Sequence, residues 1–129
     1  MRGTRRFVSL TVAIGLAALA PLGASPASAG APKKPPVKVT VNDFYFAPTA
    51  VTIRKGGSVK WVWSSTNTYP HDVHLKKGPK GLKERATYST KTTAVTDAEF
   101  KKAFPTPGTY HFICTIHPTE MKLTVVVKK

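Results

Sequence analysis

The sequence predicts an all-β fold, a Greek-key β-sandwich of seven to eight strands. Apolar and polar residues alternate over short runs, at the period of two that half-buried strands show. The chain of 129 residues contains 11 prolines and 9 glycines, which favours many turns. No stretch has the period of a convincing amphipathic helix, and short strands at this spacing are typical of a sandwich.

The first predicted strand covers residues 37–42, where valines alternate with polar residues. An aromatic cluster follows at residues 44–46. Val51 and Ile53 alternate with polar neighbours and predict the next strand. The Gly56-Gly57 pair then predicts a tight turn.

The central part of the chain continues with a strand in which Val59, Trp61 and Trp63 share one face, followed by a polar loop from Ser64 to Pro70. Val73 and Leu75 begin another extended segment. Residues 76–96 are predicted to form a long, partly irregular stretch with an edge strand around Thr87–Val95.

The last third contains three more predicted features. A strand is expected to end near Phe104, before a turn at residues 105–108. Tyr110, Phe112 and Cys114 then share the inward phase of one strand. A terminal strand, Lys122–Val127, completes the fold.

Residues 1–29 are predicted to be a secretory signal peptide. Arginines precede an apolar run of 14 residues, Phe7–Ala20, which is too short to span a bilayer. Ala27-Ser28-Ala29 supplies the small residues that signal peptidase needs, so we expect cleavage after Ala29 and no transmembrane span afterwards. The protein is then exported, and is secreted, periplasmic or associated with the cell envelope; Sec and twin-arginine export both stay open.

Residues 30–36 read as a proline-rich linker, and residues 37–129 as a single domain, expected to be monomeric. The 20 Lys+Arg against 6 Asp+Glu give a formal net charge of +14. In an exported protein this charge predicts acidic protein partners and anionic envelope surfaces rather than nucleic acid.

Cys114 is the only cysteine of the sequence. An intrachain disulfide, a Cys₄ zinc site and a cysteine-held iron–sulfur cluster are therefore excluded, because each needs several cysteines. Cys114, His117 and Met121 place a thiolate, an imidazole and a thioether within eight residues, in a predicted loop between two strands. His71 starts a strand that a Greek-key sandwich can bring beside Cys114.

Such a donor set indicates copper. Thiolate and thioether sulfur favour Cu(I), while imidazoles also accept Cu(II), so two histidines, a cysteine and a weak methionine suit both oxidation states. A rigid sandwich would hold these groups still while the charge changes, which is what one-electron transfer needs.

Three segments resemble the small blue copper proteins, the cupredoxins of the plastocyanin, pseudoazurin and amicyanin type. They are Pro70-His71-Asp72-Val73, Pro107-Gly108-Thr109-Tyr110, and the Cys-x-x-His-x-x-x-Met run with the strand after it. The resemblance spans roughly residues 37–127. It implies a single copper ion cycling between Cu(I) and Cu(II), with four ligands: His71, Cys114, His117 and Met121.

Two ligand positions have a rival in the sequence. Glu120 could replace Met121 as the axial group, although a thioether suits a buried apolar site better. His74 could replace His71, but strand alternation puts the two on opposite faces, so only one can serve. Relatives often carry asparagine after the first histidine, where this chain has Asp72.

The expected function is that of a one-electron carrier, which exchanges electrons with transient redox partners at the exposed edge of His117. The alternative is an exported copper-storage or copper-delivery protein with the same ligands. An enzyme is not expected, because multicopper enzymes need more histidine clusters than four histidines without an H-x-H motif supply. A metal-free adhesive sandwich would leave the Cys–His–Met run without a role.

Overall fold

The computed structural model describes residues 15, 22–23 and 33–129. The predicted signal peptide and the first residues of the linker lie outside these residues, apart from isolated positions. Backbone contacts divide the chain into two units, and the account below concerns the second, Pro32–Lys129. Within the described residues, no helix is both long enough and apolar enough to cross a membrane.

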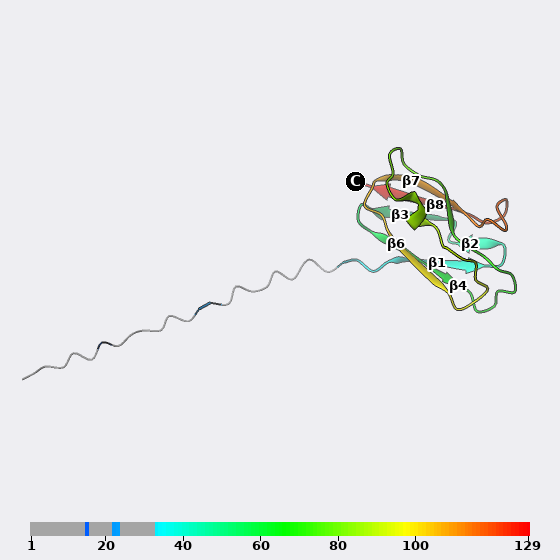
Figure 1. The fold of residues 1–129 in the computed structure, drawn as a ribbon, viewed down its shortest axis with the longest axis horizontal. Helices are drawn as coiled ribbons and strands as arrows, with labels where there is room; N and C mark the ends of the chain where they lie inside the picture. The colour runs from blue at the N-terminus through cyan, green and yellow to red at the C-terminus, as the bar shows by residue number, and fades with distance from the viewer. Residues whose placement is uncertain (1–14, 16–21, 24–32) are drawn as a thin grey trace, which may run out of the picture. The chain divides into compact units, whose positions relative to one another are not determined.

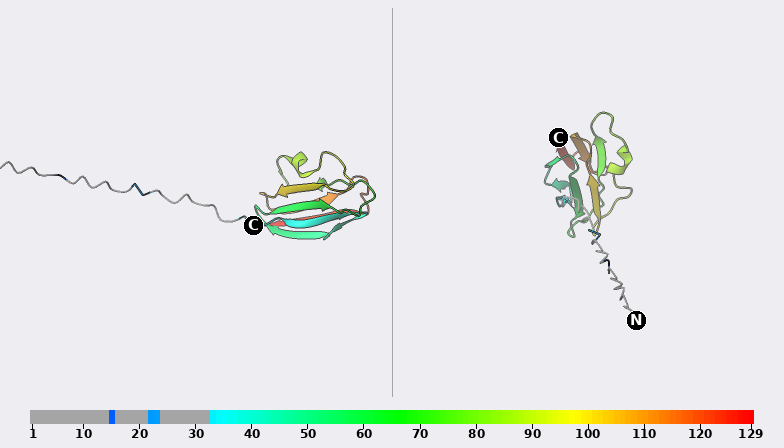
Figure 2. Two further views of the ribbon diagram at one scale, coloured as in Figure 1. Left: turned by 90° about the horizontal axis from the view of Figure 1, so that it is seen from below. Right: turned by 90° about the vertical axis from the view of Figure 1, so that its left-hand side faces the viewer.

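Eight strands form two four-stranded sheets, in agreement with the predicted sandwich (Figure 1). The first sheet has the order β2-β1-β4-β6, and the second has the order β3-β8-β7-β5. The strands are β1 (Val37–Asn42), β2 (Tyr45–Ala47), β3 (Ala50–Arg54), β4 (Ser58–Trp63), β5 (His74–Lys77), β6 (Glu99–Ala103), β7 (Gly108–Ile113) and β8 (Lys122–Lys128). Figure 2 shows the two sheets facing each other.

Strand register places the functional loops together at one end of the sandwich. β1 and β4 are parallel, as are β3 and β8, whereas the other pairs are antiparallel. β1 and β4 both finish at the end of the sandwich where β7 finishes and β8 begins. The loops after Asn42, Trp63 and Ile113 all leave from that end, which brings segments distant in sequence side by side.

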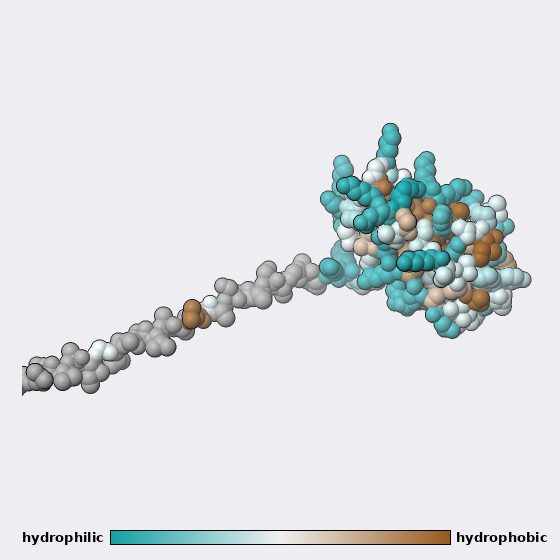
Figure 3. Space-filling view, in the orientation of Figure 1, coloured by the Kyte–Doolittle hydropathy of each residue, from teal (hydrophilic) through white to brown (hydrophobic). Residues whose placement is uncertain are grey.

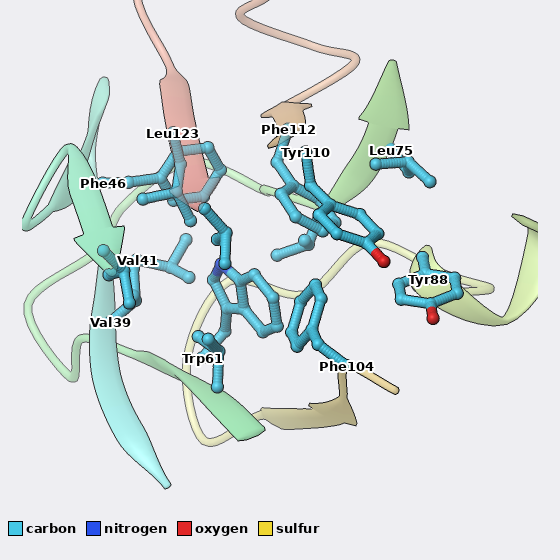
Figure 4. Packing of buried hydrophobic residues seen from close by; sticks show 14 of the residues in the cluster. Val39, Val41, Phe46, Trp61, Leu75, Tyr88, Phe104, Tyr110, Phe112 and Leu123 are labelled. Atoms are coloured by element: carbon cyan, nitrogen blue, oxygen red, sulfur yellow. The ribbon is translucent and has the colours of Figure 1, made fainter. Parts of the chain in front are cut away.

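The core fills the space between the sheets with inward side chains that follow the predicted alternation (Figure 4). Trp61 is fully buried and packs against Phe100 and Phe112, with ring centroids 5.3 and 5.1 Å away. Phe104 meets Tyr110 edge to face at 4.9 Å. Burial of each large apolar side chain contributes roughly 1.5–3 kcal/mol, so this core holds the sandwich rigid.

The turn predicted at Gly56-Gly57 is confirmed. Gly56 has a φ of +82°, a region that favours glycine, and the N–H of Gly57 donates to the carbonyl of Arg54 at 2.8 Å. A Cβ on Gly57 would lie 2.9 Å from that same carbonyl oxygen. Both positions of this turn therefore disfavour a side chain.

The edge strand predicted around Thr87–Val95 is wrong. A 3-10 helix occupies Arg85–Tyr88, and of the later residues only Ala94 forms a β-bridge, with His71. Side chains of this segment instead accept hydrogen bonds from the backbone of β5 and of the residue before it. Thr90 Oγ1 accepts from the N–H of Val73 at 3.1 Å, and Ser89 Oγ accepts from the N–H of Leu75 at 3.0 Å. The strand predicted to end near Phe104 is confirmed as β6.

Tyr110 gives the folded state a dependence on alkaline pH. Its hydroxyl donates to the carbonyl of Thr106 at 2.7 Å, and burial raises its pKa from 10.0 to about 12. The contribution of Tyr110 to stability should be constant below pH 10 and should fall as the pH rises from there to about 12, because the unfolded state loses its proton first. Tyr110→Phe should lower stability at neutral pH by about 0.5–1.5 kcal/mol and flatten this fall.

Urea unfolding of both proteins between neutral and alkaline pH measures the difference. Some slope should remain in the variant, since burial also raises the pKa of Tyr88. Identical slopes in the two proteins would contradict the assignment to Tyr110.

Candidate metal centre

Cys114 lies directly after β7, in the inward phase of Tyr110 and Phe112, and is fully buried. The backbone closes the following loop onto it: the N–H of Cys114 donates to the carbonyl of Met121 at 3.2 Å, and the N–H of Met121 donates to that of His117 at 2.9 Å. A tight loop thus returns His117 and Met121 toward the cysteine, as the sequence predicted.

His71 is fully buried, and its backbone is fixed from two sides. It exchanges two hydrogen bonds of 2.9 Å with Ala94, and its carbonyl accepts from Trp63 Nε1 at 3.2 Å. The preceding loop is anchored by the buried Asn67, whose amide donates to the carbonyls of Val41 and Val95 at 2.9 and 3.1 Å. These contacts hold the imidazole at the end of the sandwich.

The structure brings the donor atoms of His71, Cys114 and His117 together, all within 4.8 Å of one another. Nδ1 of each histidine lies 3.9 Å from Cys114 Sγ. In zinc sites, metal–nitrogen and metal–sulfur bonds of about 2.0 and 2.3 Å together exceed this separation, so one metal ion can contact both atoms. A thiolate between two imidazole nitrogens fits copper in either oxidation state.

Asp43, in the turn between β1 and β2, fixes the orientation of His71. His71 Nε2 lies 2.8 Å from Asp43 Oδ1, so Nε2 donates to the carboxylate and the ring is turned with Nδ1 toward the cluster. The carboxylate also accepts from Thr68 and from the N–H of Tyr69. The hydrogen bond from His71, followed by these contacts, holds the pKa of Asp43 well below its usual range.

Asp72 joins the two loops that carry the donor atoms. Its Oδ1 accepts from the N–H of Thr115 at 2.7 Å, and its Oδ2 accepts from the Thr115 hydroxyl. Asp72 follows His71 and Thr115 follows Cys114, so this contact sets the spacing of the donors. The carboxylate therefore occupies a position that links the loops, although the sequence resemblance expected an amide there.

The two axial candidates differ sharply in their surroundings. Met121 is fully buried, whereas Glu120 is exposed. A hydrogen bond with the Thr119 side chain is the main cause that lowers the pKa of Glu120, which favours its charged form. A charged, exposed carboxylate is suited to water, and a buried thioether is suited to the interior.

A cluster of aromatic rings surrounds the partly exposed imidazole of His117. Phe44 meets it edge to face at 5.0 Å, and Tyr69 does so at 6.2 Å. Phe44 and Tyr69 are themselves 5.1 Å apart, and both are about half exposed. His117 therefore reaches the surface beside exposed apolar side chains. The apolar rim is defined here as Phe44 and Tyr69, whose rings contact the imidazole, together with the exposed Ile116, which precedes His117 in sequence.

The other two histidines lie outside the cluster. His74 is exposed on β5, on the opposite face from His71, and His111 is exposed on β7 beside Thr124 Oγ1 at 3.3 Å. Sequence reasoning missed Asp43 and Phe44. An acidic residue in a turn carries no local signal of its distant partner, but the adjacent aromatic run could have suggested exposed rings, because alternation buries only Phe46.

Breaking the Asp72–Thr115 contact should loosen the centre. Asp72→Ala removes both acceptors and should cost about 1–2 kcal/mol, below the range for buried charged bonds because the pair is partly exposed. Metal affinity should fall about 10–100-fold. Asp72→Asn keeps one acceptor and should lose less, and Thr115→Val should fall between them. Urea unfolding and competitive metal titration measure these effects; an Ala variant equal to wild type in both would contradict the role.

Comparisons with known proteins agree with this geometry. The family described as copper binding proteins of the plastocyanin/azurin family matches residues 34–128. Amicyanin-alpha from Methylorubrum extorquens is 34% identical over 128 residues, covering 93% of this chain and 89% of the relative. Plastocyanin from Prochlorothrix hollandica is 30% identical over 117 residues, covering 88% and 86%.

Among solved structures, a copper-containing nitrite reductase from Thermus scotoductus SA-01 superposes with a TM-score of 0.61 at 25% identity. It matches 81% of this chain, but this chain spans only 25% of that protein. The family match covers all eight strands of the sandwich, which carries a Cys–His–His cluster that suits copper. The chain belongs to the plastocyanin/azurin family of copper binding proteins, the small blue copper proteins.

Proposed function

We propose that the protein is an exported carrier that binds one copper ion and exchanges one electron at a time at the exposed edge of His117. The observation that carries the proposal is the convergence of two imidazole nitrogens on the buried Cys114 sulfur at the rigid end of a sandwich. The proposed ligands are His71, Cys114, His117 and Met121. Copper would supply a Cu(I)/Cu(II) couple, in keeping with the family's role as blue copper electron carriers.

The residues of this chain perform the remaining tasks. Asp43 orients the His71 ring through its contact with Nε2, and the Asp72–Thr115 contact holds the two donor loops at a fixed spacing. Burial of Cys114 excludes water and protects the thiol from oxidation. Because hydrogen bonds and packing restrain every donor loop, little rearrangement should accompany a change of charge.

Electron exchange is proposed at the apolar rim of Phe44, Tyr69 and Ile116, where His117 reaches the surface. A small apolar contact of this kind suits transient redox partners, since it can form without a large buried area. The net charge of +14, of which +11 would remain without residues 1–29 and their three arginines, supports acidic partners, whose approach would slow as salt is added. Export is supported by the signal-peptide pattern in residues 1–29.

A carrier is favoured over an enzyme. The chain corresponds to a quarter of the nitrite reductase that it resembles, and residues 33–129 contain one cluster of three or more metal-binding histidine, cysteine or acidic side chains. Copper storage or delivery would use the same donors, so optical and redox measurements have to separate it from electron transfer.

Addition of Cu(II) to the purified protein should produce an intense thiolate-to-copper band in the visible range. Cys114→Ser should abolish the band, because serine supplies no sulfur orbital, while the variant should keep its fold. Visible absorption and circular dichroism measure both. A wild-type protein that binds copper but stays colourless would contradict the electron carrier and favour storage or delivery.

The axial position can be assigned by redox titration. Met121→Gln should lower the reduction potential, because an amide oxygen stabilises Cu(II) relative to a thioether. Glu120→Gln serves as the neighbouring control and should leave the potential nearly unchanged, since Glu120 is exposed. A shift confined to the Glu120 variant would contradict the choice of Met121.

A further inference from the structure

A groove of about 760 Å³ lies at the end of the sandwich opposite the metal centre. It forms where the stem before β1 passes the β3–β4 turn and the last residues of β6 and β8. The register places it there: Arg54 pairs with Lys128, and Ser58 pairs with Ala103, at the far ends of their strands. We call this feature the basic groove.

Six cationic side chains line the basic groove, and none of its described lining residues is acidic. The cations are Lys33, Lys34, Arg54, Lys55, Lys101 and Lys128. Within residues 33–129, Lys60 and Glu99 form the one ion pair between a lysine or arginine and a carboxylate. Arg54 Nη1 donates to the backbone oxygen of Lys129 at 3.2 Å, but no Asp or Glu carboxylate of the described residues pairs with the six cations. An external anion would therefore relieve their mutual repulsion.

The acidic residues lie elsewhere. Asp43, Asp72 and Glu120 belong to the loops of the metal centre. Asp97 and Glu99 lie where β6 begins, in the half of the sandwich that contains the metal centre, because Glu99 pairs with Val62 near the end of β4. Glu84, which precedes the 3-10 helix, is the one remaining acidic residue, and it does not line the groove. Five of the six carboxylates thus lie toward the metal centre, and none lines the basic groove.

The shape of the basic groove selects among anionic partners. A concave site admits a chain, whereas a bilayer presents a broad surface and is held by large apolar side chains that insert into it. The exposed aromatic side chains Phe44, Tyr45 and Tyr69 lie at the metal-centre end, and Figure 3 shows hydrophilic surface over much of the opposite end. Val37, one-third exposed, is the largest exposed apolar residue in the groove.

We propose that the basic groove binds a flexible, linear polymer that carries phosphate groups. Lysine ammonium groups and the Arg54 guanidinium are the side chains that best bind phosphate oxygens. A polymer of repeated phosphates also releases its condensed counterions when several cations bind it, which strengthens binding at low salt. Carboxylate polymers and anionic bilayers are the alternatives that the experiment separates.

This arrangement has a consequence that rests on the proposed function. A carrier held by the basic groove keeps the apolar rim around His117 free, because the two features lie at opposite ends of the strands. The polymer would thus retain the protein in the cell envelope with its electron-exchanging end available to partners.

The test compares two variants with the same change in charge. The groove variant carries Lys33→Gln, Lys34→Gln, Lys55→Gln and Lys101→Gln, and all four side chains are exposed. The control variant changes four exposed lysines of β5 and the loop after it, Lys76, Lys77, Lys80 and Lys83, to Gln. The probe is long-chain inorganic polyphosphate, and its binding to the purified, copper-loaded protein is measured by titration calorimetry at several salt concentrations.

The wild-type protein should bind polyphosphate far more tightly than orthophosphate, and its affinity should fall with salt. The groove variant should lose at least about tenfold in affinity and show a shallower salt dependence, while the control variant stays close to wild type. Equal losses in the two variants would contradict the assignment of binding to the basic groove. Tighter binding to poly-glutamate would contradict the choice of a phosphate polymer. Tighter binding to vesicles of equal parts phosphatidylglycerol and phosphatidylcholine would show that the ligand is a bilayer and would contradict the choice of a polymer.

The same experiment separates failure of this inference from failure of the proposed function. Both variants should keep the visible copper band of the wild type, which verifies that they fold. The copper-free protein should bind polyphosphate as tightly as the copper-loaded protein, since none of the proposed ligands lines the groove. A polymer affinity that disappears with the copper would contradict a site at the opposite end.

Discussion

The hydrogen bonds between Asp72 and Thr115 set the spacing on which the metal centre depends. They connect residues 43 positions apart in sequence, and each partner directly follows a proposed ligand. One of them joins the backbone of the loop after β7 to the loop before β5. With it, the Cys114 sulfur and two imidazole nitrogens lie within 4.8 Å of one another, close enough for one metal ion to contact them. The rigidity of the core extends to the centre through these bonds, which is why the fold can serve electron transfer.

Much of the fold could be predicted because burial on one face of a strand imposes a period of two. β1, β4 and β7 follow that period closely, and each has its inward residues in the core. The segment Thr87–Val95 could not be assigned in this way. Its conformation depends on bonds from Ser89 and Thr90 to the distant backbone around β5, and polar residues give no periodic signal of such contacts.

The candidate site likewise contains residues that could be predicted from the sequence and residues that could not. Cys114, His117 and Met121 lie close in sequence, so their shared loop could be recognised from spacing alone. His71 could be preferred to His74 because alternation places only one of them inward, and the structure buries His71 while exposing His74. Asp43 could not be found, because its hydrogen bond spans 28 residues and depends on how β1 lies beside β4. The gathering of six cations in the basic groove likewise depends on the register of the strands, so net charge alone suggested attraction to anions without indicating which surface would meet them.

The central claim is that one copper ion is held by the Cys114 thiolate together with Nδ1 of His71 and of His117. X-ray absorption at the copper edge of the loaded protein tests it most directly, because the method counts nitrogen and sulfur neighbours without relying on colour or activity. The account predicts one short sulfur neighbour and two imidazole nitrogens, with the sulfur absent in Cys114→Ser. A copper ion surrounded only by nitrogen and oxygen in the wild-type protein would contradict it.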